Sequence, residues 1–144
     1  MTSERVISVN TQHLVSANHS LPSLALQVTK LVDSYMLWIG IAEGSPDDAE
    51  TSVFQGSLCK DWACAMPPKT PGTIPPATSL FRSSSTDIAL SMAQRLAKRF
   101  QKQIFLSVDL PTTFLSMGQG LQLLQEAEKG IVVTLKRIEN DSSS

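Results

Sequence analysis

Residues 91–110 read SMAQRLAKRFQKQIFLSVDL, and the spacing of their apolar side chains changes halfway along. Up to Lys102 the apolar residues recur every three or four positions, which is the period of a helix that packs one face against a core. From Gln103 to Leu110 they alternate, which is the period of a strand. No Gly or Pro separates the two patterns. The segment therefore predicts a helix that runs directly into a strand.

The predicted helix has one apolar face and one basic face, and residues 83–87 before it offer several N-cap side chains. The apolar stripe consists of Ile88, Met92, Leu96 and Phe100, with Ala89, Ala93 and Ala97 beside it. The basic side chains are Arg95, Lys98, Arg99 and Lys102. They fit a solvated face with cations near the negative end of the helix dipole. The second interpretation is a docking patch for an acidic protein surface, which would raise the association rate more than the affinity.

The rest of the chain predicts further strands and loops. Strands are expected at 5–10, 24–32, 35–41, 58–66 and 77–81, with loops at about 43–57 and 67–76. A tight turn at Asp33-Ser34 would join the second and third strands into a hairpin. Residues 35–41, YMLWIGI, are apolar on both faces, which is typical of a strand in the middle of a sheet. Leu58, Trp62, Cys59 and Cys64 are expected to be available for burial in the fourth strand.

The C-terminal segment has two interpretations. GIVVTLKRI, residues 130–138, could be a strand, but apolar residues from Leu121 onward lie three or four apart and favour one helix over 118–138. That helix must tolerate Gly130 at a cost of about 1 kcal/mol relative to Ala. Residues 140–144 are expected to be a frayed tail. The element order predicts an α+β fold, with a mainly antiparallel, sandwich-like sheet and two packed helices.

Composition limits the possible classes. The 144 residues are 42% hydrophobic with a net charge of −1, which suits a single globular domain over residues 1–144. This charge balance does not suit a dedicated nucleic-acid-binding protein. We therefore expect no nucleic-acid partner. No apolar run has the length of a signal peptide or a membrane span, so we also expect no membrane partner and a location in the cytoplasm and the nucleus.

Motifs for catalysis, cofactors or metals are not found in the sequence. Cys59 and Cys64 have a C-x4-C spacing that matches no common zinc site, and two reduced thiols are the simpler interpretation. His13 and His19 have no flanking residue that would orient them, and a solvated loop or strand edge is the expected place for both. The nucleophile elbow and the phosphate-binding glycine motifs are missing. We therefore predict no catalytic residue, no metal ligand and no cofactor.

Three segments resemble the proteasome assembly chaperone 4 family. VDSYMLWIGIA at 32–42 is similar to a strand motif of that family, and ATSLF at 77–81 is similar to its STSL segment. MAQRLAKRFQKQIFLSVDL at 92–110 is similar to its helix-to-strand signature. The three occur in family order. The resemblance covers 32–42 and 58–110 and fades toward both ends, and the long loops suggest a fungal or otherwise divergent member.

The resemblance implies a non-enzymatic function. Members of the family pair with the related proteasome assembly chaperone 3. The heterodimer binds α-type subunits of the 20S proteasome, chiefly around α5, and promotes assembly of the α-ring without nucleotide or metal. The expected fold is that of the chaperone 3 and 4 group, a small sandwich-like sheet with helices packed on it.

Candidate partner-binding residues follow from the patterns rather than from the family. The basic residues Arg95, Lys98, Arg99 and Lys102 are candidates for a client. Phe105, Leu135 and Ile138 are candidates for the heterodimer interface, although each could belong to the ordinary core. The alternative function is a small adaptor or trafficking module that dimerises through sheet edges. A small hydrolase would need a role for His13 or His19.

Overall fold

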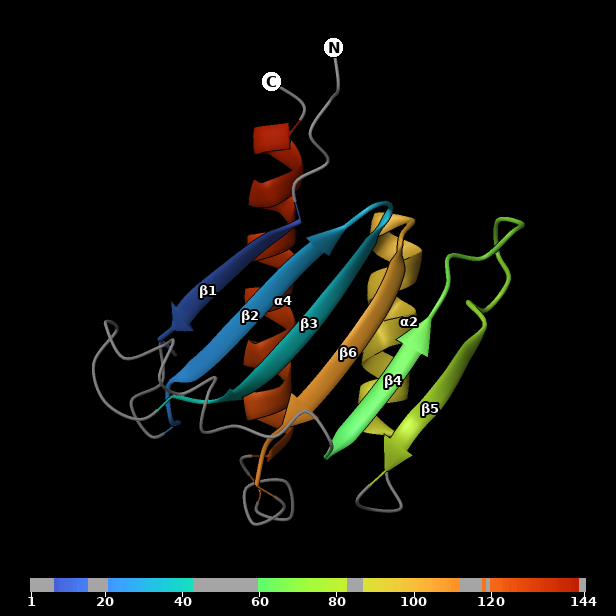
Figure 1. Ribbon diagram of the computed structural model, residues 1–144. Coiled ribbons are helices and arrows are strands. Elements are labelled where there is room, and N and C mark those ends of the chain that lie inside the picture. The colour runs from blue at the N-terminus through green and yellow to red at the C-terminus, as the bar shows by residue number, and fades with distance from the viewer. Residues whose placement is uncertain are drawn as a thin grey trace.

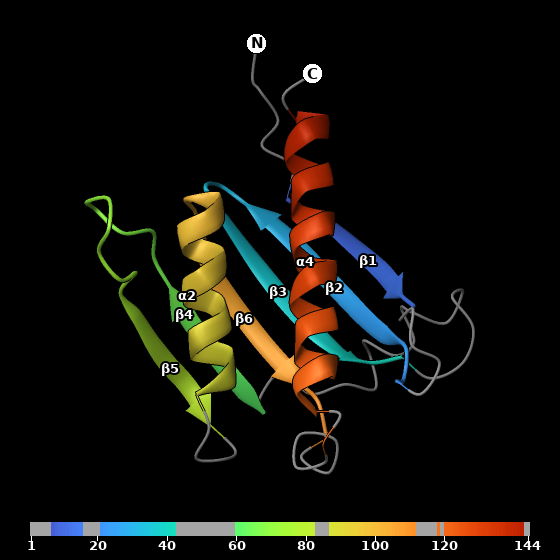
Figure 2. The same ribbon diagram turned by 180° about the vertical axis from the view of Figure 1, so that it is seen from behind.

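The computed structural model describes residues 7–15, 21–42, 60–82, 87–111, 118 and 120–142. Its elements are β1 (Ser8–Leu14), β2 (Leu24–Leu31), β3 (Ser34–Ile41), β4 (Asp61–Ala65), β5 (Ala77–Arg82), α2 (Ile88–Phe100), β6 (Gln103–Asp109) and α4 (Gly120–Ser142). The strands form one six-stranded sheet, and both helices cover the same face of it (Figures 1 and 2). The predicted α+β class with two packed helices is confirmed, and the second layer of the sandwich is helical.

The strand order is β1-β2-β3-β6-β4-β5, so the last strand in the sequence lies inside the sheet. It pairs parallel with β3 on one side and antiparallel with β4 on the other. The remaining pairs, β1–β2, β2–β3 and β4–β5, are antiparallel. The sheet is therefore mainly antiparallel, as predicted, with one parallel pair that the element order did not reveal.

The hairpin of β2 and β3 forms as predicted, with its turn one residue earlier. Asp33 adopts a positive φ of 53° in the turn, and Ser34 already belongs to β3, where it pairs with Leu31. Asp tolerates this left-handed conformation better than most residues. β3 lies between β2 and β6, which confirms that its two apolar faces mark a central strand.

β1 differs from its prediction in length. Its expected start at residue 5 lies outside the described residues, and its end is at Leu14 rather than Asn10. The polar residues Thr11, Gln12 and His13 gave no apolar signal, but pairing along the full length of β2 keeps them extended.

β4 is shorter than the predicted strand over 58–66, and Leu58 and Cys59 lie outside the described residues. Asp61, Ala63 and Ala65 are buried, whereas Trp62 and Cys64 are half-buried on the other side of the strand. The side under α2 takes small residues because the helix approaches closely there, so the bulkier Trp62 lies on the opposite side. The proline-rich residues 67–76 contain no helix or strand, as expected.

The junction between α2 and β6 is made by a single residue in the left-handed conformation. The helix ends at Phe100, and Gln101 follows with a φ of 54°. Its backbone N–H donates to the Ala97 carbonyl over 2.9 Å, and its side-chain Nε2 donates to the Lys98 carbonyl over 2.6 Å. Gly usually occupies this position, and here the side-chain bond of Gln helps to satisfy the helix end. The direct passage from helix to strand is confirmed, with the helix ending two residues before Lys102.

The start of α2 departs from the capping prediction. Asp87 is the residue before the helix, but its side chain makes no capping hydrogen bond. Its carboxylate instead accepts a hydrogen bond from the Arg82 guanidinium over 2.7 Å. The other predicted N-cap residues, 83–86, lie outside the described part of the chain.

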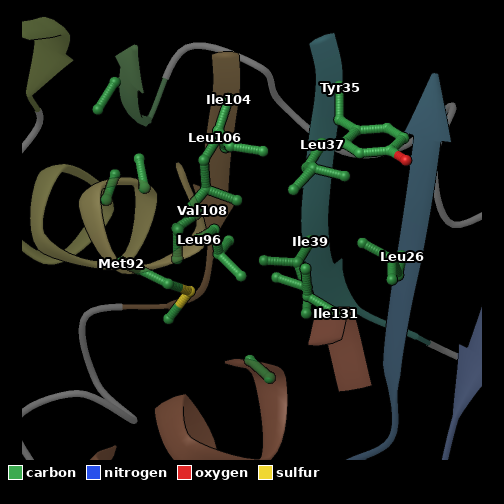
Figure 3. Packing of buried hydrophobic residues seen from close by; sticks show 14 of the residues in the cluster. Leu26, Tyr35, Leu37, Ile39, Met92, Leu96, Ile104, Leu106, Val108 and Ile131 are labelled. Atoms are coloured by element: carbon green, nitrogen blue, oxygen red, sulfur yellow. The ribbon is translucent and has the colours of Figure 1, made fainter. Parts of the chain in front are cut away.

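The core lies between the helices and the sheet face that they cover (Figure 3). Alternate residues of β3 and β6 point toward the helices, and the predicted stripe of α2 meets them. The central buried side chains include Tyr35, Leu37, Ile39, Met92, Leu96, Ile104, Leu106 and Ile131, each at most 1% exposed. Burial of this scale, at about 25 cal/mol per Å² of apolar surface, is the main force that holds the layers together.

The last segment is a helix, so the strand alternative is wrong. α4 continues to Ser142, and residues 140–142, expected in the tail, are helical. Its buried side chains include Leu123, Ala127, Ile131 and Leu135, whereas Leu121 is 68% exposed. The buried stripe of α4 therefore begins at Leu123, and not at Leu121 as the sequence pattern predicted.

Gly130 has a packing reason for its place in α4. A Cβ atom built there would lie 2.5 Å from a terminal methyl carbon of Leu14. The absence of a side chain at Gly130 therefore allows Leu14, at the end of β1, to pack against α4.

We expect Gly130→Ala and Leu14→Ala to be energetically coupled. Ala at position 130 should gain up to about 1 kcal/mol of helix propensity, but with Leu14 present part of this gain is lost to the contact. In the Leu14→Ala background the gain should be larger by roughly 1 kcal/mol. Urea denaturation of the four variants measures this difference, and equal effects in both backgrounds would contradict the packing role.

Tyr35 is the only tyrosine of the chain and is 1% exposed. Its hydroxyl donates to the Glu139 carboxylate of α4 over 3.5 Å. Burial, followed by the charge of Glu139 and this hydrogen bond, raises the pKa of Tyr35 from 10.0 to about 12.

Near-ultraviolet absorbance of tyrosinate should therefore report one group, with a midpoint near pH 12 in the folded chain and near pH 10 in urea. Because the folded pKa lies above the unfolded value, the stability from neutral Tyr35 is complete below about pH 10 and is lost as the pH rises toward 12. Glu139→Gln should lower the midpoint but leave it above the unfolded value, since burial is the larger cause. A folded-state midpoint near pH 10 would show that the phenol is not buried.

Candidate protein-interaction surfaces

Both described helices lie on one face of the sheet, and no helix of the described residues lies on the other face. The residues of β3, β4 and β6 that point away from the helices include Met36, Trp38, Trp62, Cys64 and Phe105, here called the open face. Figure 1 views the sheet from this side, with both helices behind it. An apolar sheet face that no helix covers is a candidate surface for another protein.

The side chains of the open face form rows across the strands. Phe105 on β6 is paired with Met36 on β3 and with Cys64 on β4. These three side chains are half-buried. Directly opposed side chains on one face are close enough to pack together, so the row presents a continuous apolar strip.

A second row runs from Trp38 through Ser107 to Trp62. Trp38 is 4% exposed, and a Cβ atom built on Gly40 would lie 2.5 Å from its ring. The indole therefore lies across Gly40, close to the backbone of β3. Only a residue without a side chain permits this arrangement, which keeps the open face flat at its centre.

Charged groups mark the end of the open face. Lys60 Nζ lies 3.2 Å from Asp109 Oδ1, and both residues are at the same end of the β4–β6 pair. An apolar centre with a charged border is a common arrangement of protein interfaces. Gln103, at the other end of β6, donates from Nε2 to Cys64 Sγ over 3.3 Å.

The basic face of α2 is only partly available to a partner. Arg95 Nε donates to Glu128 Oε1 over 2.7 Å and so ties α2 to α4. This pair forms part of the wall of a cleft of about 520 Å³ between the two helices, where Ile88, Met92 and Leu124 supply apolar lining. Glu128 is the one charged residue in the apolar stripe predicted for the last helix. A charge at such a position indicates that a basic side chain lies nearby.

The other basic residues remain near the C-terminal end of α2. Lys98 and Arg99 are exposed, and they form no ion pair within the described part of the chain. Lys102 is half-buried and lines a shallow hollow together with Lys30 and Tyr35. Three of the four predicted basic candidates thus cluster at one end of the molecule, and they lie on the helical layer, on the other side of the sheet from Phe105.

The candidates for the heterodimer interface separate in the structure. Leu135 is fully buried in the core of the chain, so it is not available to a partner here. Ile138 is partly buried and packs against the same core. Phe105 is the one of the three that lies on the open face. Met36 and Trp62 were not selected from the sequence, although their position on the alternate side of apolar strands was the signal that could have found them.

The described residues do not form a candidate metal site. No group of three or more His, Cys, Asp or Glu side chains in that part of the chain could hold a metal ion. His13 lies on the edge strand β1, as expected, but its two ring nitrogens are enclosed and have no hydrogen-bond partner among the described residues, so the side chain is not solvated there. His19 and Cys59 lie outside the described residues. Among the described helices, none is both long and apolar enough to cross a membrane.

Comparison with known proteins gives concordant results. The family model for proteasome assembly chaperone 4 matches residues 23–110. Proteasome assembly chaperone 4 of Mus musculus is 33% identical over 86 residues, which are 60% of this chain and 58% of the mouse protein. The match thus spans less than two thirds of that relative.

A solved chain from a yeast chaperone complex for 20S proteasome assembly superposes with a TM-score of 0.61. At 15% identity, with 88% of this chain and 96% of that chain covered, it shows a common fold. The three motifs that carried the resemblance all lie within the residues matched by the family model. The chain belongs to the proteasome assembly chaperone 4 family.

Proposed function

We propose that this chain acts without catalysis, as one half of a chaperone heterodimer that binds α-type subunits of the 20S proteasome and promotes assembly of the α-ring. The partner is a small chaperone related to proteasome assembly chaperone 3, and the principal client is the α5 subunit. The complex acts in the cytoplasm and nucleus. Family membership and the open face support this proposal.

The open face is the structural observation that most supports the proposed heterodimer. Its central residue, Phe105, is flanked by Met36 and Cys64, and the three side chains form a strip on the side of the sheet opposite the described helices. A related chain with the same fold would present a sheet face of similar shape. Two such faces pack about 10 Å apart and bury both apolar strips.

The proposed mechanism is selection between similar subunits. Neighbouring α subunits share much of their contact surface, so a ring assembled without guidance can contain wrong neighbours. A chaperone that binds one subunit and accepts only its correct neighbour adds a difference in free energy between right and wrong rings. About 1.4 kcal/mol gives a tenfold preference. Release follows when an incoming subunit competes for the same surface.

The basic end of α2 is suited to the client. Lys98 and Arg99 are exposed on the layer opposite the open face, so a partner on the open face leaves them accessible. Exposed charges act over about 8–10 Å at physiological salt and mainly raise the rate of encounter.

The test of the heterodimer is co-expression of the chain with its related chaperone, followed by size exclusion with light scattering. We expect a one-to-one complex that increases the yield of rings from purified α subunits. Phe105→Lys should weaken this complex at least about a hundredfold, because it buries an unpaired charge at the centre of the interface. Leu121→Lys, on an exposed position of α4, is the control that should retain the complex.

Each result has a clear consequence. If Phe105→Lys melts as the parent does and still binds the partner, the open face is not the interface. If the parent chain binds neither the related chaperone nor any α subunit, the proposed function is wrong.

Charge reversal at Lys98 and Arg99 together should slow association with α subunits, and the effect should be larger at low salt than at high salt. Stopped-flow fluorescence at two ionic strengths measures the rates. The control is Lys69→Glu with Lys129→Glu, which changes the net charge equally at exposed positions elsewhere. Equal rates for parent and variant at both salt concentrations would remove the basic end of α2 from the binding surface.

A further inference from the structure

A hollow of about 550 Å³ lies at the end of the sheet where β2 turns into β3. The residues of its lining that matter here are Ile7, Lys30, Val32, Asp33, Tyr35 and Lys102. We propose that this hollow holds an acidic side chain of the client α subunit, together with an apolar neighbour of that side chain. The inference rests on the proposed function, and it assigns the client a contact beyond the exposed cations of α2.

Two tight backbone turns meet at the hollow and give it a fixed shape. Asp33 and Gln101 have positive φ values of 53° and 54°. The Gln103 N–H donates to the Asp33 carbonyl over 3.3 Å and so joins the hairpin turn to the junction that follows α2. Figures 1 and 2 show the β2–β3 turn next to the end of α2. The hollow is therefore formed before a client arrives, and a preformed site loses little conformational entropy on binding.

The charges of the hollow favour an acidic ligand group. Lys30 and Lys102 both line it, against the single carboxylate of Asp33. Lys102 is half-buried and forms no ion pair with the residues that the structure describes. Salt screens a partly buried cation less than an exposed one. A carboxylate that enters the hollow would therefore be held more firmly than one that meets a cation on the open surface.

The hollow also has an apolar part. Ile7 and Val32 line it and are each 63% exposed. Tyr35 is 1% exposed and its hydroxyl already donates to Glu139, so it contributes a wall of the hollow rather than a donor for a ligand. A lone anion would leave the two aliphatic side chains in water. A client segment in which an acidic residue neighbours an apolar residue suits both parts, as in the mixed contacts of protein interfaces.

The position of the hollow links it to the surface already proposed for the client. Lys30 and Tyr35 are paired across β2 and β3, and Tyr35 belongs to the core under the helices, so this side of the hairpin is opposite the open face. The exposed Lys98 and Arg99 lie in the last turn of α2, just before Lys102. The exposed cations would raise the rate of encounter, and the hollow would set the lifetime of the complex.

Dissociation of purified α5 from the co-expressed heterodimer, followed by biolayer interferometry, tests the inference. Val32→Asp places a carboxylate in the hollow and should speed dissociation at least about tenfold, because it repels the acid of the client. Val133→Asp is the matched control. It makes the same change on α4 at a position that is 59% exposed, and it should dissociate at the parent rate. Equal melting temperatures of the two variants check that both remain folded.

Two substitutions of Lys102 separate charge from side-chain length. Lys102→Met removes the cation at similar length and should also speed dissociation about tenfold, since it leaves the acid of the client without a partner. Lys102→Arg keeps the cation and should retain slow dissociation. If Val32→Asp and Lys102→Met both release α5 at the parent rate, the hollow is not a contact and the inference is wrong.

Photo-crosslinking identifies what occupies the hollow. With p-benzoylphenylalanine at position 32 of the heterodimer, we expect a crosslink to an α5 peptide in which Asp or Glu neighbours an apolar residue. The same group at position 133 should give no such product. A crosslink to the related chaperone, or to a client segment without an acidic residue, overturns the inference while the proposed function stands. A parent heterodimer that binds no α subunit overturns the proposed function, and this inference with it.

Discussion

The whole sheet depends on the pairing of β6 with β3. These strands run parallel in the middle of the sheet, with Tyr35 beside Ile104, Leu37 beside Leu106 and Ile39 beside Val108. On its other side β6 holds β4, and through it β5. Without β6 the chain would consist of two separate groups of strands, each with an unsatisfied inner edge and an uncovered apolar face. Both helices pack over this junction, so the core and the sheet are completed by the same strand.

The change of apolar period at residues 91–110 was sufficient to predict the elements around that junction. α2, β6, the β2–β3 hairpin and the central place of β3 all follow from local patterns. The parallel pair did not, because β3 and β6 are separated by two strands and a helix, and no local pattern encodes such a distant contact. The facing of β4 also escaped prediction, since it depends on how closely α2 approaches Ala63 and Ala65.

The interaction surfaces were less predictable than the fold. A basic helix face is visible in a sequence, but the ion pair of Arg95 with Glu128 requires knowing that α4 lies beside α2. Apolar residues look alike in a sequence whichever side of their helix or strand they occupy, so Leu135 of α4 and Phe105 of β6 could not be ranked before one was found in the core and the other on the open face. Family resemblance added the class of partner, which packing alone does not supply.

The late position of β6 in the chain has a consequence for synthesis on the ribosome. A nascent chain that has not yet reached Asp109 has made five of the six strands, yet it has no central ladder. Until then β3 and β4 each present a bare inner edge, and the growing polypeptide is most vulnerable to misassociation at this stage. Co-translational folding of this small protein therefore has to wait for most of its length, and translation speed through the segment before β6 sets how long that exposure lasts.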